Sequence, residues 1–178
     1  ITPNTVAFLA EPIQGEAGII VPPEGYLTKV REICTKHNIL FIADEVQTGF
    51  ARTGRMFACN FENVEPDIFV MGKALGGGIM PVSAIAANKD ILGVFTPGTH
   101  GSTFGGNPLG CAVAVKAMEI LVRDNYHKLA EEKGEYFMKK LREIDCDEII
   151  EVRGKGLLIG VEFKVPAAAY VKKCIAAG

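Results

Sequence analysis

The sequence predicts an α/β protein: a three-layer α/β/α arrangement around a mainly parallel sheet, followed by the start of a smaller α+β unit. Two observations lead to this prediction. In the first half of the chain, short runs of bulky aliphatic residues alternate with stretches of helical periodicity, as strands connected by helices do. The second half instead carries two long helical stretches in succession before the next apolar strand.

The chain begins with a predicted strand, helix, strand unit. Thr5–Ala10 (TVAFLA) is a short apolar run that ends before Pro12, a residue that does not continue a helix. Over residues 24–38 the apolar side chains recur at helical spacing, which predicts an amphipathic helix. Ile39–Ala43 (ILFIA) is continuous and aliphatic, which favours a strand covered on both faces.

Two further strands are predicted at Asp67–Met71 (DIFVM) and Val82–Ala87 (VSAIAA). Ligands of a parallel sheet bind beyond the carboxyl ends of its strands. Asp44 and Glu45 follow one such end, and Lys73 follows the next. Because ionised carboxylates are rarely buried without a partner, we expect this acidic pair to face a cation or the mouth of a cleft.

The second half of the chain predicts a different order of elements. Asn107 is a suitable N-cap for a helix that has proline in its first turn. The expected joint between two units is Asp124-Asn125, which separates a larger unit (1–124) from the beginning of a smaller one (125–178). The predicted helices are Pro108–Arg123, Tyr126–Ile144 and Ala167–Ala177, and a strand (LLIGVEF) after a GKG turn lies within Val152–Val165.

Composition excludes several classes of function. The 178 residues are 48% hydrophobic and include 19 basic and 21 acidic side chains, for a net charge of −2. No basic run is present, so binding to nucleic acid or to an anionic membrane surface has no electrostatic support. No apolar run is long enough to cross a bilayer. We therefore expect a globular, cytoplasmic protein, with the mitochondrial matrix as the alternative in a eukaryote.

The cysteines and histidines predict neither a disulfide framework nor a metal site. The five cysteines are widely spaced and never form a C-x-x-C pair, which is typical of reduced, cytosolic cysteines. The three histidines are not spaced for joint ligation of a metal ion.

One kind of chemistry needs the residue types found at Asp44, Gln47 and Lys73. A lysine amine can form a Schiff base with an aldehyde. An aspartate can keep a pyridine nitrogen protonated, which makes the ring an electron sink. These residue types, placed at two neighbouring strand ends, predict a site for pyridoxal 5′-phosphate, whose ring nitrogen is then the cation that faces Asp44.

Four stretches carry a resemblance to a known family: AEPIQGEAG (Ala10–Gly18), FIADEVQTGFARTGR (Phe41–Arg55), PDIFVMGKALGGG (Pro66–Gly78) and HGSTFGGNPLG (His100–Gly110). They are similar to signature blocks of the class III, fold type I, pyridoxal-phosphate-dependent aminotransferases. The blocks occur in one collinear order over nearly the whole chain. VRGKGLL (Val152–Leu158) resembles the ornithine branch of this family in particular.

The resemblance implies a role for each matching residue. Lys73 corresponds to the lysine that binds the cofactor and then moves a proton between the substrate and the cofactor. Asp44 corresponds to the partner of the ring nitrogen. Gln47 corresponds to a donor to the phenolate oxygen of the cofactor, and Val46 to an apolar support for one face of the ring.

The resemblance also implies a dimer and a means of choosing substrates. Ser102 and Thr103 have hydroxyls suited to a phosphate, and in the family the threonine reaches the cofactor of the neighbouring subunit. Glu16 corresponds to a carboxylate that pairs with a substrate-binding arginine, which lies beyond residue 178. This pair lets one site accept ornithine and then 2-oxoglutarate, so the expected reaction is transfer of the δ-amino group of L-ornithine to 2-oxoglutarate.

Other interpretations of the same residues remain open. Acetylornithine or another ω-amino acid is an alternative donor, because FIADEVQTG is shared across the family. An aspartate-glutamate pair after a strand also suits a phosphate-loop nucleotide hydrolase, although no G-x-x-x-x-G-K-[ST] occurs here. A third alternative is a catalytically silent dimerisation fragment. The chain resembles only part of the family pattern, so we expect the piece alone to bind the cofactor weakly and to be inactive.

Overall fold

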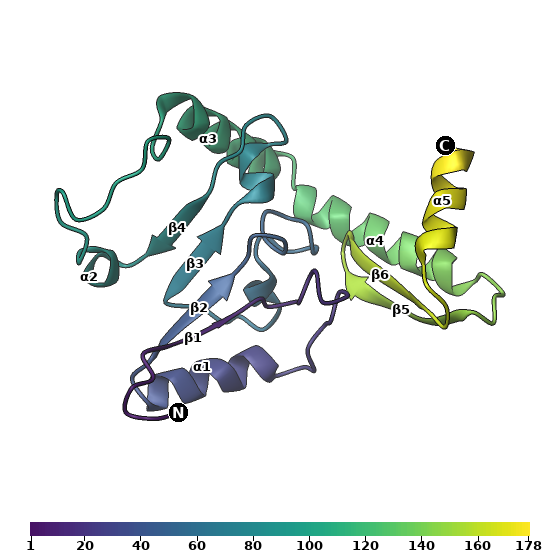
Figure 1. The fold of residues 1–178 in the computed structure, drawn as a ribbon, viewed down its shortest axis with the longest axis horizontal. Helices are drawn as coiled ribbons and strands as arrows, with labels where there is room; N and C mark the ends of the chain where they lie inside the picture. The colour runs from purple at the N-terminus through teal and green to yellow at the C-terminus, as the bar shows by residue number, and fades with distance from the viewer.

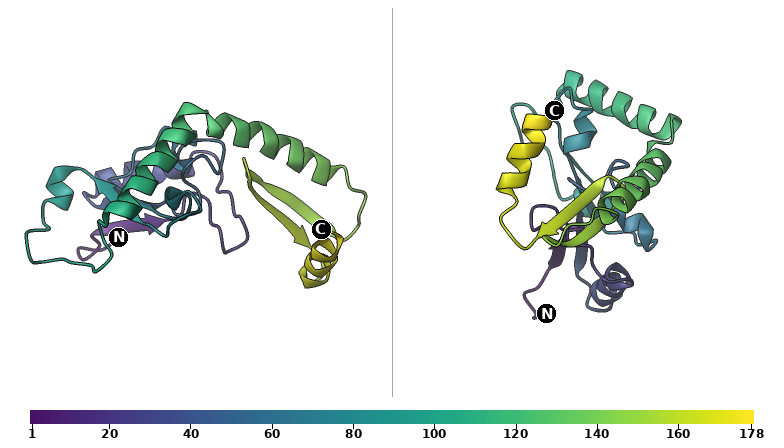
Figure 2. Two further views of the ribbon diagram at one scale, coloured as in Figure 1. Left: turned by 90° about the horizontal axis from the view of Figure 1, so that it is seen from above. Right: turned by 90° about the vertical axis from the view of Figure 1, so that its right-hand side faces the viewer.

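The computed structural model describes residues 1–178 and contains two separate sheets joined by long helices (Figure 1). The larger sheet has four strands in the order β1-β2-β3-β4, and the smaller is the hairpin β5-β6. Figure 2 shows that the hairpin and the last helix lie apart from the larger sheet. The strands are β1 (Ala7–Ala10), β2 (Leu40–Asp44), β3 (Ile68–Met71), β4 (Ala84–Ala87), β5 (Ile149–Lys155) and β6 (Leu158–Phe163).

The larger sheet confirms the predicted mainly parallel α/β arrangement. β1, β2 and β3 are parallel, and β4 runs antiparallel to β3. The connection between β3 and β4 contains one turn of 3₁₀ helix, η2 (Lys73–Gly76), and no α-helix of the kind that usually connects parallel strands.

Helix α1 (Tyr26–Lys36) covers one face of this sheet and forms the main core with β2. Phe41 and Ala43 are fully buried on that face, while Leu40 and Ile42, on the other face, are only half-buried. Within this chain β2 is therefore fully covered on the face that meets α1 and partly covered on the other face. A continuous aliphatic run shows how apolar a strand is. How far each of its faces is buried depends on which elements pack against that face.

Helix α3 (Pro108–Arg123) begins and ends as the sequence predicted. The Asn107 side chain accepts a hydrogen bond of 2.7 Å from the Gly110 amide, and proline occupies the first turn. Asn125 has a left-handed backbone (φ +52°) and turns the chain into α4 (Tyr126–Arg142). The remaining elements are the short helix α2 (Lys89–Leu92), the 3₁₀ turn η1 (Ala58–Phe61) and the last helix α5 (Ala168–Ala177).

The hairpin contains one strand that the sequence analysis missed. LLIGVEF forms β6 as expected, and its partner β5 (IIEVRGK) was not predicted. Charged residues and glycine interrupt the apolar alternation of β5, so its pairing with β6 decides its structure.

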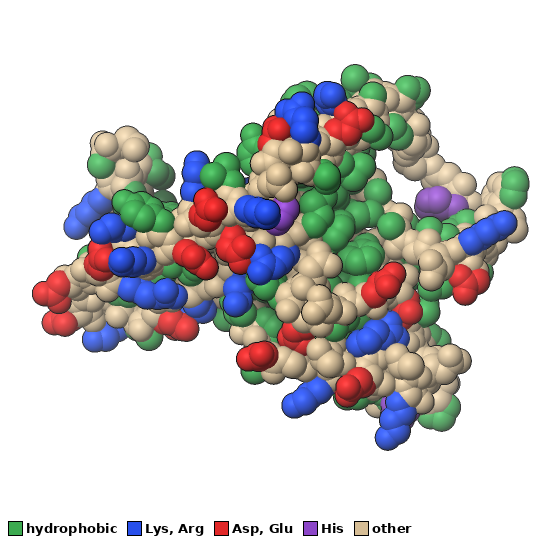
Figure 3. All heavy atoms as spheres, turned by 180° about the vertical axis from the view of Figure 1, so that it is seen from behind, with side chains coloured by type: hydrophobic (Ala, Val, Ile, Leu, Met, Phe, Trp, Pro, Cys, Tyr) green, Lys and Arg blue, Asp and Glu red, His purple; other side chains and the backbone are tan.

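The surface of the molecule divides by residue type. Hydrophobic side chains gather below α3 on the face shown in Figure 3, whereas charges of both signs mix over α4. Exposed apolar side chains of α3 and of the loop before it include Phe104, Leu109 and Val122. None of the helices is both long and apolar enough to span a bilayer.

Candidate active site

Asp44 and Lys73 emerge at the same edge of the sheet, from two neighbouring parallel strands. Asp44 is the last residue of β2 and is paired with Val70 of β3, and the Glu45 amide donates to the Val70 carbonyl at 2.9 Å. Neighbouring strands lie about 4.8 Å apart. Lys73 follows shortly after the end of β3, so the carboxylate and the amine open on the same side of the sheet.

The two adjacent carboxylates have opposite surroundings. Glu45 is fully buried and accepts hydrogen bonds from the Ala58 amide (3.0 Å), the Cys59 amide (2.9 Å) and the Thr48 hydroxyl. These donors satisfy its oxygens inside the protein. Glu45 therefore fastens the 3₁₀ turn η1 to the end of β2.

The Asp44 carboxylate has few partners within the chain. It is half-buried, its Oδ1 accepts a 3.1 Å hydrogen bond from the Val46 amide, and it forms no ion pair with another side chain of the chain. The backbone contact fixes the direction of the carboxylate, and its second oxygen remains able to bind a cationic group.

The backbone around Lys73 has an unusual conformation. Lys73 is exposed and has φ of +44°, in the left-handed region that side chains other than glycine seldom adopt. Val46 lies against the residue before it, because a methyl group on Gly72 would be 3.5 Å from Cγ1 of Val46. Strained backbone of this kind concentrates at functional sites, where the surrounding structure holds it in place.

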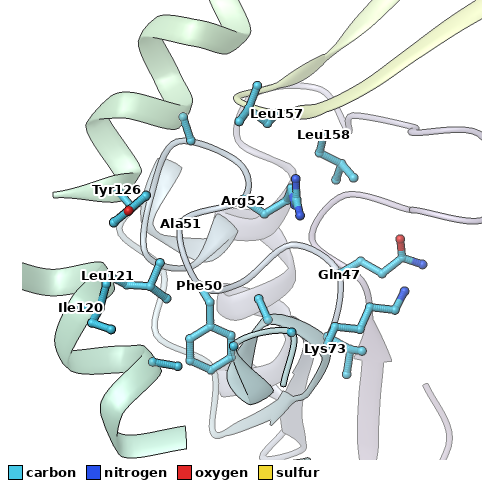
Figure 4. Close-up of a pocket in the computed structure, with 16 residues that line it drawn as sticks. Gln47, Phe50, Ala51, Arg52, Lys73, Ile120, Leu121, Tyr126, Leu157 and Leu158 are labelled. Atoms are coloured by element: carbon cyan, nitrogen blue, oxygen red, sulfur yellow. The ribbon is translucent and has the colours of Figure 1, made fainter. Parts of the chain in front are cut away.

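Val46, Gln47 and Lys73 line a cavity of about 810 Å³, within the range of small-molecule sites, and Asp44 is not among the residues that line it. Its wall comes from the sheet edge, from α3 and α4 and from the β5-β6 turn. Figure 4 shows the Lys73 amine and the Gln47 amide on the same side of this space. Lining residues with a polar group or from the second half of the chain include Gln47, Arg52, Lys73, Tyr126 and Leu157.

Gln47 and Glu16 contact each other at the edge of this cavity. Nε2 of Gln47 donates to Oε1 of Glu16 at 3.0 Å. The amide lies closely over Gly15, since a methyl group there would be 2.6 Å from the Gln47 Cδ. The structure thus brings Glu16 to the other predicted residues, and within this chain its hydrogen-bond partner is the glutamine.

Ser102 and Thr103 lie elsewhere. Both are exposed in the loop between α2 and α3, and neither lines the cavity that contains Lys73. The Ser102 hydroxyl accepts a 3.0 Å hydrogen bond from the Gly105 amide, and Ser102 lines a separate hollow beside Met80 and Ser83. Any phosphate that these hydroxyls bind is therefore not adjacent to Lys73 of the same chain.

Sequence reasoning missed most of the cavity wall, including Arg52, Tyr126 and Leu157. Tyr126 and Leu157 come from the second half of the chain, and no local pattern connects them with the strand ends. Arg52 lies in the loop after β2, where the buried Thr53 hydroxyl donates to the Thr48 carbonyl at 3.3 Å.

The donor set at the strand ends fits pyridoxal phosphate. Asp44 offers a carboxylate without a cationic partner, Lys73 an exposed amine, and Val46 an apolar surface. These groups match a ring with a protonated nitrogen, an aldehyde and two apolar faces. Nowhere do three or more His, Cys, Asp or Glu side chains come together as metal ligands.

Comparison with known proteins identifies the family. The whole chain, residues 1–178, matches the family described as aminotransferase class-III. It is 64% identical over 173 residues to the ornithine aminotransferase of Oceanobacillus iheyensis, and 57% identical over 178 residues to that of Bacillus cereus. These matches cover 97% and 100% of the chain but only 44% and 45% of the relatives, so the chain spans about half their length.

Solved structures agree with the sequence matches. The ornithine aminotransferase of Plasmodium yoelii superposes with a TM-score of 0.93 at 48% identity, covering 97% of this chain and 47% of that one. The acetylornithine aminotransferase of Elizabethkingia anophelis gives a TM-score of 0.88 at 51% identity over 93% of this chain and 44% of that one. Class III aminotransferases depend on pyridoxal phosphate. The chain belongs to the class-III aminotransferase family.

Proposed function

We propose that this chain forms the part of a pyridoxal-phosphate-dependent aminotransferase that holds the cofactor's ring and its lysine. The observation that carries the proposal is the position of Asp44 and Lys73 at the carboxyl ends of two adjoining parallel strands, where Lys73 and Gln47 line a cavity. In the proposed reaction the δ-amino group of L-ornithine passes to 2-oxoglutarate, which gives glutamate semialdehyde and glutamate.

The residues divide the chemistry between them. When bound, the cofactor supplies an electron-withdrawing ring that stabilises negative charge at the reacting carbon. Lys73, in its neutral form, would take the proton from the substrate carbon that carries the transferred amine and deliver it to the cofactor's aldehyde carbon. Asp44 keeps the proton on the ring nitrogen, Val46 excludes water from one ring face, and Gln47 donates a hydrogen bond to the ring oxygen.

The identity of the donor rests on the relatives and on Glu16. Curated relatives at 57–64% identity are named ornithine aminotransferases, which supports ornithine. The Elizabethkingia structure is named an acetylornithine aminotransferase, which keeps that donor as the alternative. Glu16 places a negative charge at the cavity edge, where it attracts the second amine of a diamino acid or pairs with an arginine outside this chain.

The proposal includes the assembly and the place of action. Ser102 and Thr103 lie away from Lys73, as they must if they bind the phosphate of a neighbouring subunit, and exposed apolar residues such as Phe104 and Leu109 suit burial in a homodimer. Residues 1–124 then belong to the large domain and 125–178 to the start of the small one. All five cysteines are free, which suits the cytoplasm.

The test uses a complete enzyme, because the chain spans 44% of its relative. In a chimera, residues 1–178 replace the matching segment of the Oceanobacillus iheyensis ornithine aminotransferase. We expect near-visible cofactor absorbance, attachment of the cofactor to Lys73 after borohydride reduction, and faster turnover with ornithine than with acetylornithine. Faster turnover with acetylornithine would show that acetylornithine, and not ornithine, is the amino donor. A folded chimera that takes up no cofactor would overturn the proposal. Magnesium-dependent ATP hydrolysis by that chimera would instead favour a nucleotide hydrolase.

A further inference from the structure

Arg153 connects the hairpin to a loop 135 residues earlier in the chain. Its Nε donates to the Gly18 carbonyl at 3.0 Å and to the Ile19 carbonyl at 3.2 Å, and its Nη2 donates to Gly18 at 2.7 Å. Its Nη1 pairs with Glu151 at 2.8 Å and with Glu162. The side chain is only 17% exposed, so these contacts are partly shielded from water.

The loop that Arg153 holds has a strained backbone. Gly18 has φ of +116° and Ile19 has φ of +56°, a left-handed conformation that is rare for a β-branched residue. This conformation directs both carbonyls at the guanidinium. Strained segments keep such a shape only where their surroundings impose it, and here Arg153 supplies a charged donor for each carbonyl.

The same loop carries Glu16 to the edge of the cavity. Gly15 accepts hydrogen bonds from the Gly18 and Ile19 amides, at 3.0 and 3.1 Å, so residues 15–19 form one tight turn. Glu16 lies inside this turn and accepts a 3.0 Å hydrogen bond from Gln47. Gly18 and Ile19, which Arg153 binds, therefore belong to the same turn as the Glu16 carboxylate.

We propose that Arg153 is a positioning residue that acts through Glu16: it holds the 15–19 turn so that the carboxylate stays on Gln47 and out of the substrate space. The inference rests on the proposed function and extends it to the control of substrate charge. With the turn released, the Glu16 charge is free to enter the cavity, where it repels a dicarboxylate acceptor and does not repel a cationic donor.

Lysine does not replace this arginine. Arg153 uses three nitrogens at once, for two carbonyls and two carboxylates, whereas an ammonium group is one point charge with three donors. Arg153→Lys is therefore expected to behave like Arg153→Met. Arg142→Met is the matched control, since Arg142 also donates to a backbone carbonyl of the hairpin (Val152, 3.0 Å) and makes no contact with the turn.

The experiment compares the two half-reactions of the chimera. In Arg153→Met we expect KM for 2-oxoglutarate to rise about fivefold, the scale of one ordinary hydrogen bond, and KM for ornithine not to rise. In an enzyme that already carries Glu16→Gln, the Arg153 substitution should no longer raise KM for the acceptor. Arg142→Met lowers Tm without changing the ratio of the two KM values.

A second readout needs neither cofactor nor turnover. Hydrogen exchange of the amides of residues 15–20 should become about tenfold faster in Arg153→Met and should be unchanged in Arg142→Met. The proposal would be overturned if Arg153→Met raised KM equally in both half-reactions and did so also in the Glu16→Gln enzyme. Unchanged hydrogen exchange of residues 15–20 in Arg153→Met would overturn it as well. The two proposals can fail separately. If the chimera never transaminates, the proposed function is rejected. If hydrogen exchange in the turn is still faster in Arg153→Met, Arg153 remains the residue that holds the turn.

Discussion

Two neighbouring carboxylates in this protein perform different tasks because a strand directs successive side chains to opposite faces. Asp44 is half-buried at the end of β2, accepts one hydrogen bond from the Val46 amide and pairs with no cation of the chain. Glu45 faces inward and is enclosed by donors from Thr48, Ala58 and Cys59. One carboxylate is thus available for chemistry, and the other keeps the strand end in place.

The structural role of Glu45 predicts a loss of stability on neutral substitution. In Glu45→Gln an NH₂ group replaces an oxygen among donors, which leaves buried hydrogen-bonding groups unpaired at a cost of about 1–3 kcal/mol in the free energy of unfolding. Chemical denaturation measures this loss. Glu65→Gln, at an exposed carboxylate, is the control and should change stability by less than about 0.5 kcal/mol. Equal stability of both variants would contradict the assignment.

Alanine substitutions at Lys73, Asp44 and Gln47 should reduce the activity of the chimera to different extents. Lys73→Ala is expected to abolish turnover while the stability stays within about 0.5 kcal/mol, because the side chain is exposed and packs little. Asp44→Ala should be nearly as severe, since the ring nitrogen loses its counter-charge. Gln47→Ala removes one hydrogen-bonding group and should reduce kcat/KM about fivefold, the equivalent of about 1 kcal/mol. Small, equal effects at all three positions would show that the site is misassigned.

Cys59 gives the stability a dependence on alkaline pH. Burial, and then the neighbouring Glu45 carboxylate, raise the pKa of this thiol far above its ordinary value near 9. The unfolded chain therefore releases a proton above about pH 9 that the folded chain retains, so stability is complete below this pH and decreases above it, by up to about 1.4 kcal/mol per pH unit.

Denaturation of the wild type and of Cys59→Ala between pH 8 and pH 10.5 tests this sign. We expect the stability of the wild type to fall more steeply with pH than that of the variant. Cys111→Ala is the matched control, because Cys111 is exposed. Parallel pH profiles for the wild type and Cys59→Ala would contradict the expectation.

At the scale of elements, helix α4 and the β5-β6 turn approach so closely that only glycine fits between them. A methyl group on Gly134 would overlap the Gly156 carbonyl, and a methyl group on Gly54 would lie 3.1 Å from the Glu131 Cβ. The Leu157 amide also donates to the Arg52 carbonyl at 2.9 Å. These contacts join the loop after β2 to both elements of the second half of the chain.

Gly134→Ala tests this close approach. Alanine gains about 1 kcal/mol of helix propensity over glycine, but overlap with a backbone carbonyl that cannot move aside costs about 1–3 kcal/mol or more. Because the carbonyl belongs to a tight turn, we expect the clash to prevail and Tm to fall. Gly101→Ala is the control, since no atom lies within 4 Å of the added methyl group and its Tm should stay near that of the wild type. A stabilised Gly134→Ala would show that helix propensity outweighs the contact.

At the scale of the whole molecule, the cavity exists because the two halves of the chain meet there. Arg55 pairs with Glu131 at 2.7 Å, and Phe61 lies between the charged groups of Arg55 and Lys155, at 5.1 and 5.2 Å from its ring centre. Tyr126 from the second half lines the same cavity as the strand ends of the first.

Much of the fold could be predicted from local signals. The helix cap at Asn107, the apolar spacing of α1 and the aliphatic run of β2 each act within a few residues, so their elements form where the sequence placed them. The strand β5 was not predicted, because its polar residues hide the alternation of apolar and polar positions. Its extended structure depends on pairing with β6. The aliphatic run of β2 did not say which of its faces meets helix α1, because hydrophobicity alone carries no information on the packing partner.

By itself, the sequence determined the strand ends that carry Asp44 and Lys73, the residue types suited to the cofactor and, through its motifs, the family. Only the tertiary structure decided that Glu45 turns inward, that Glu16 contacts Gln47 and that Arg153 holds the turn between them. The physical reason is distance along the chain. The last two contacts join residues 31 and 135 positions apart, and packing of the whole molecule, rather than any local pattern, brings such groups together.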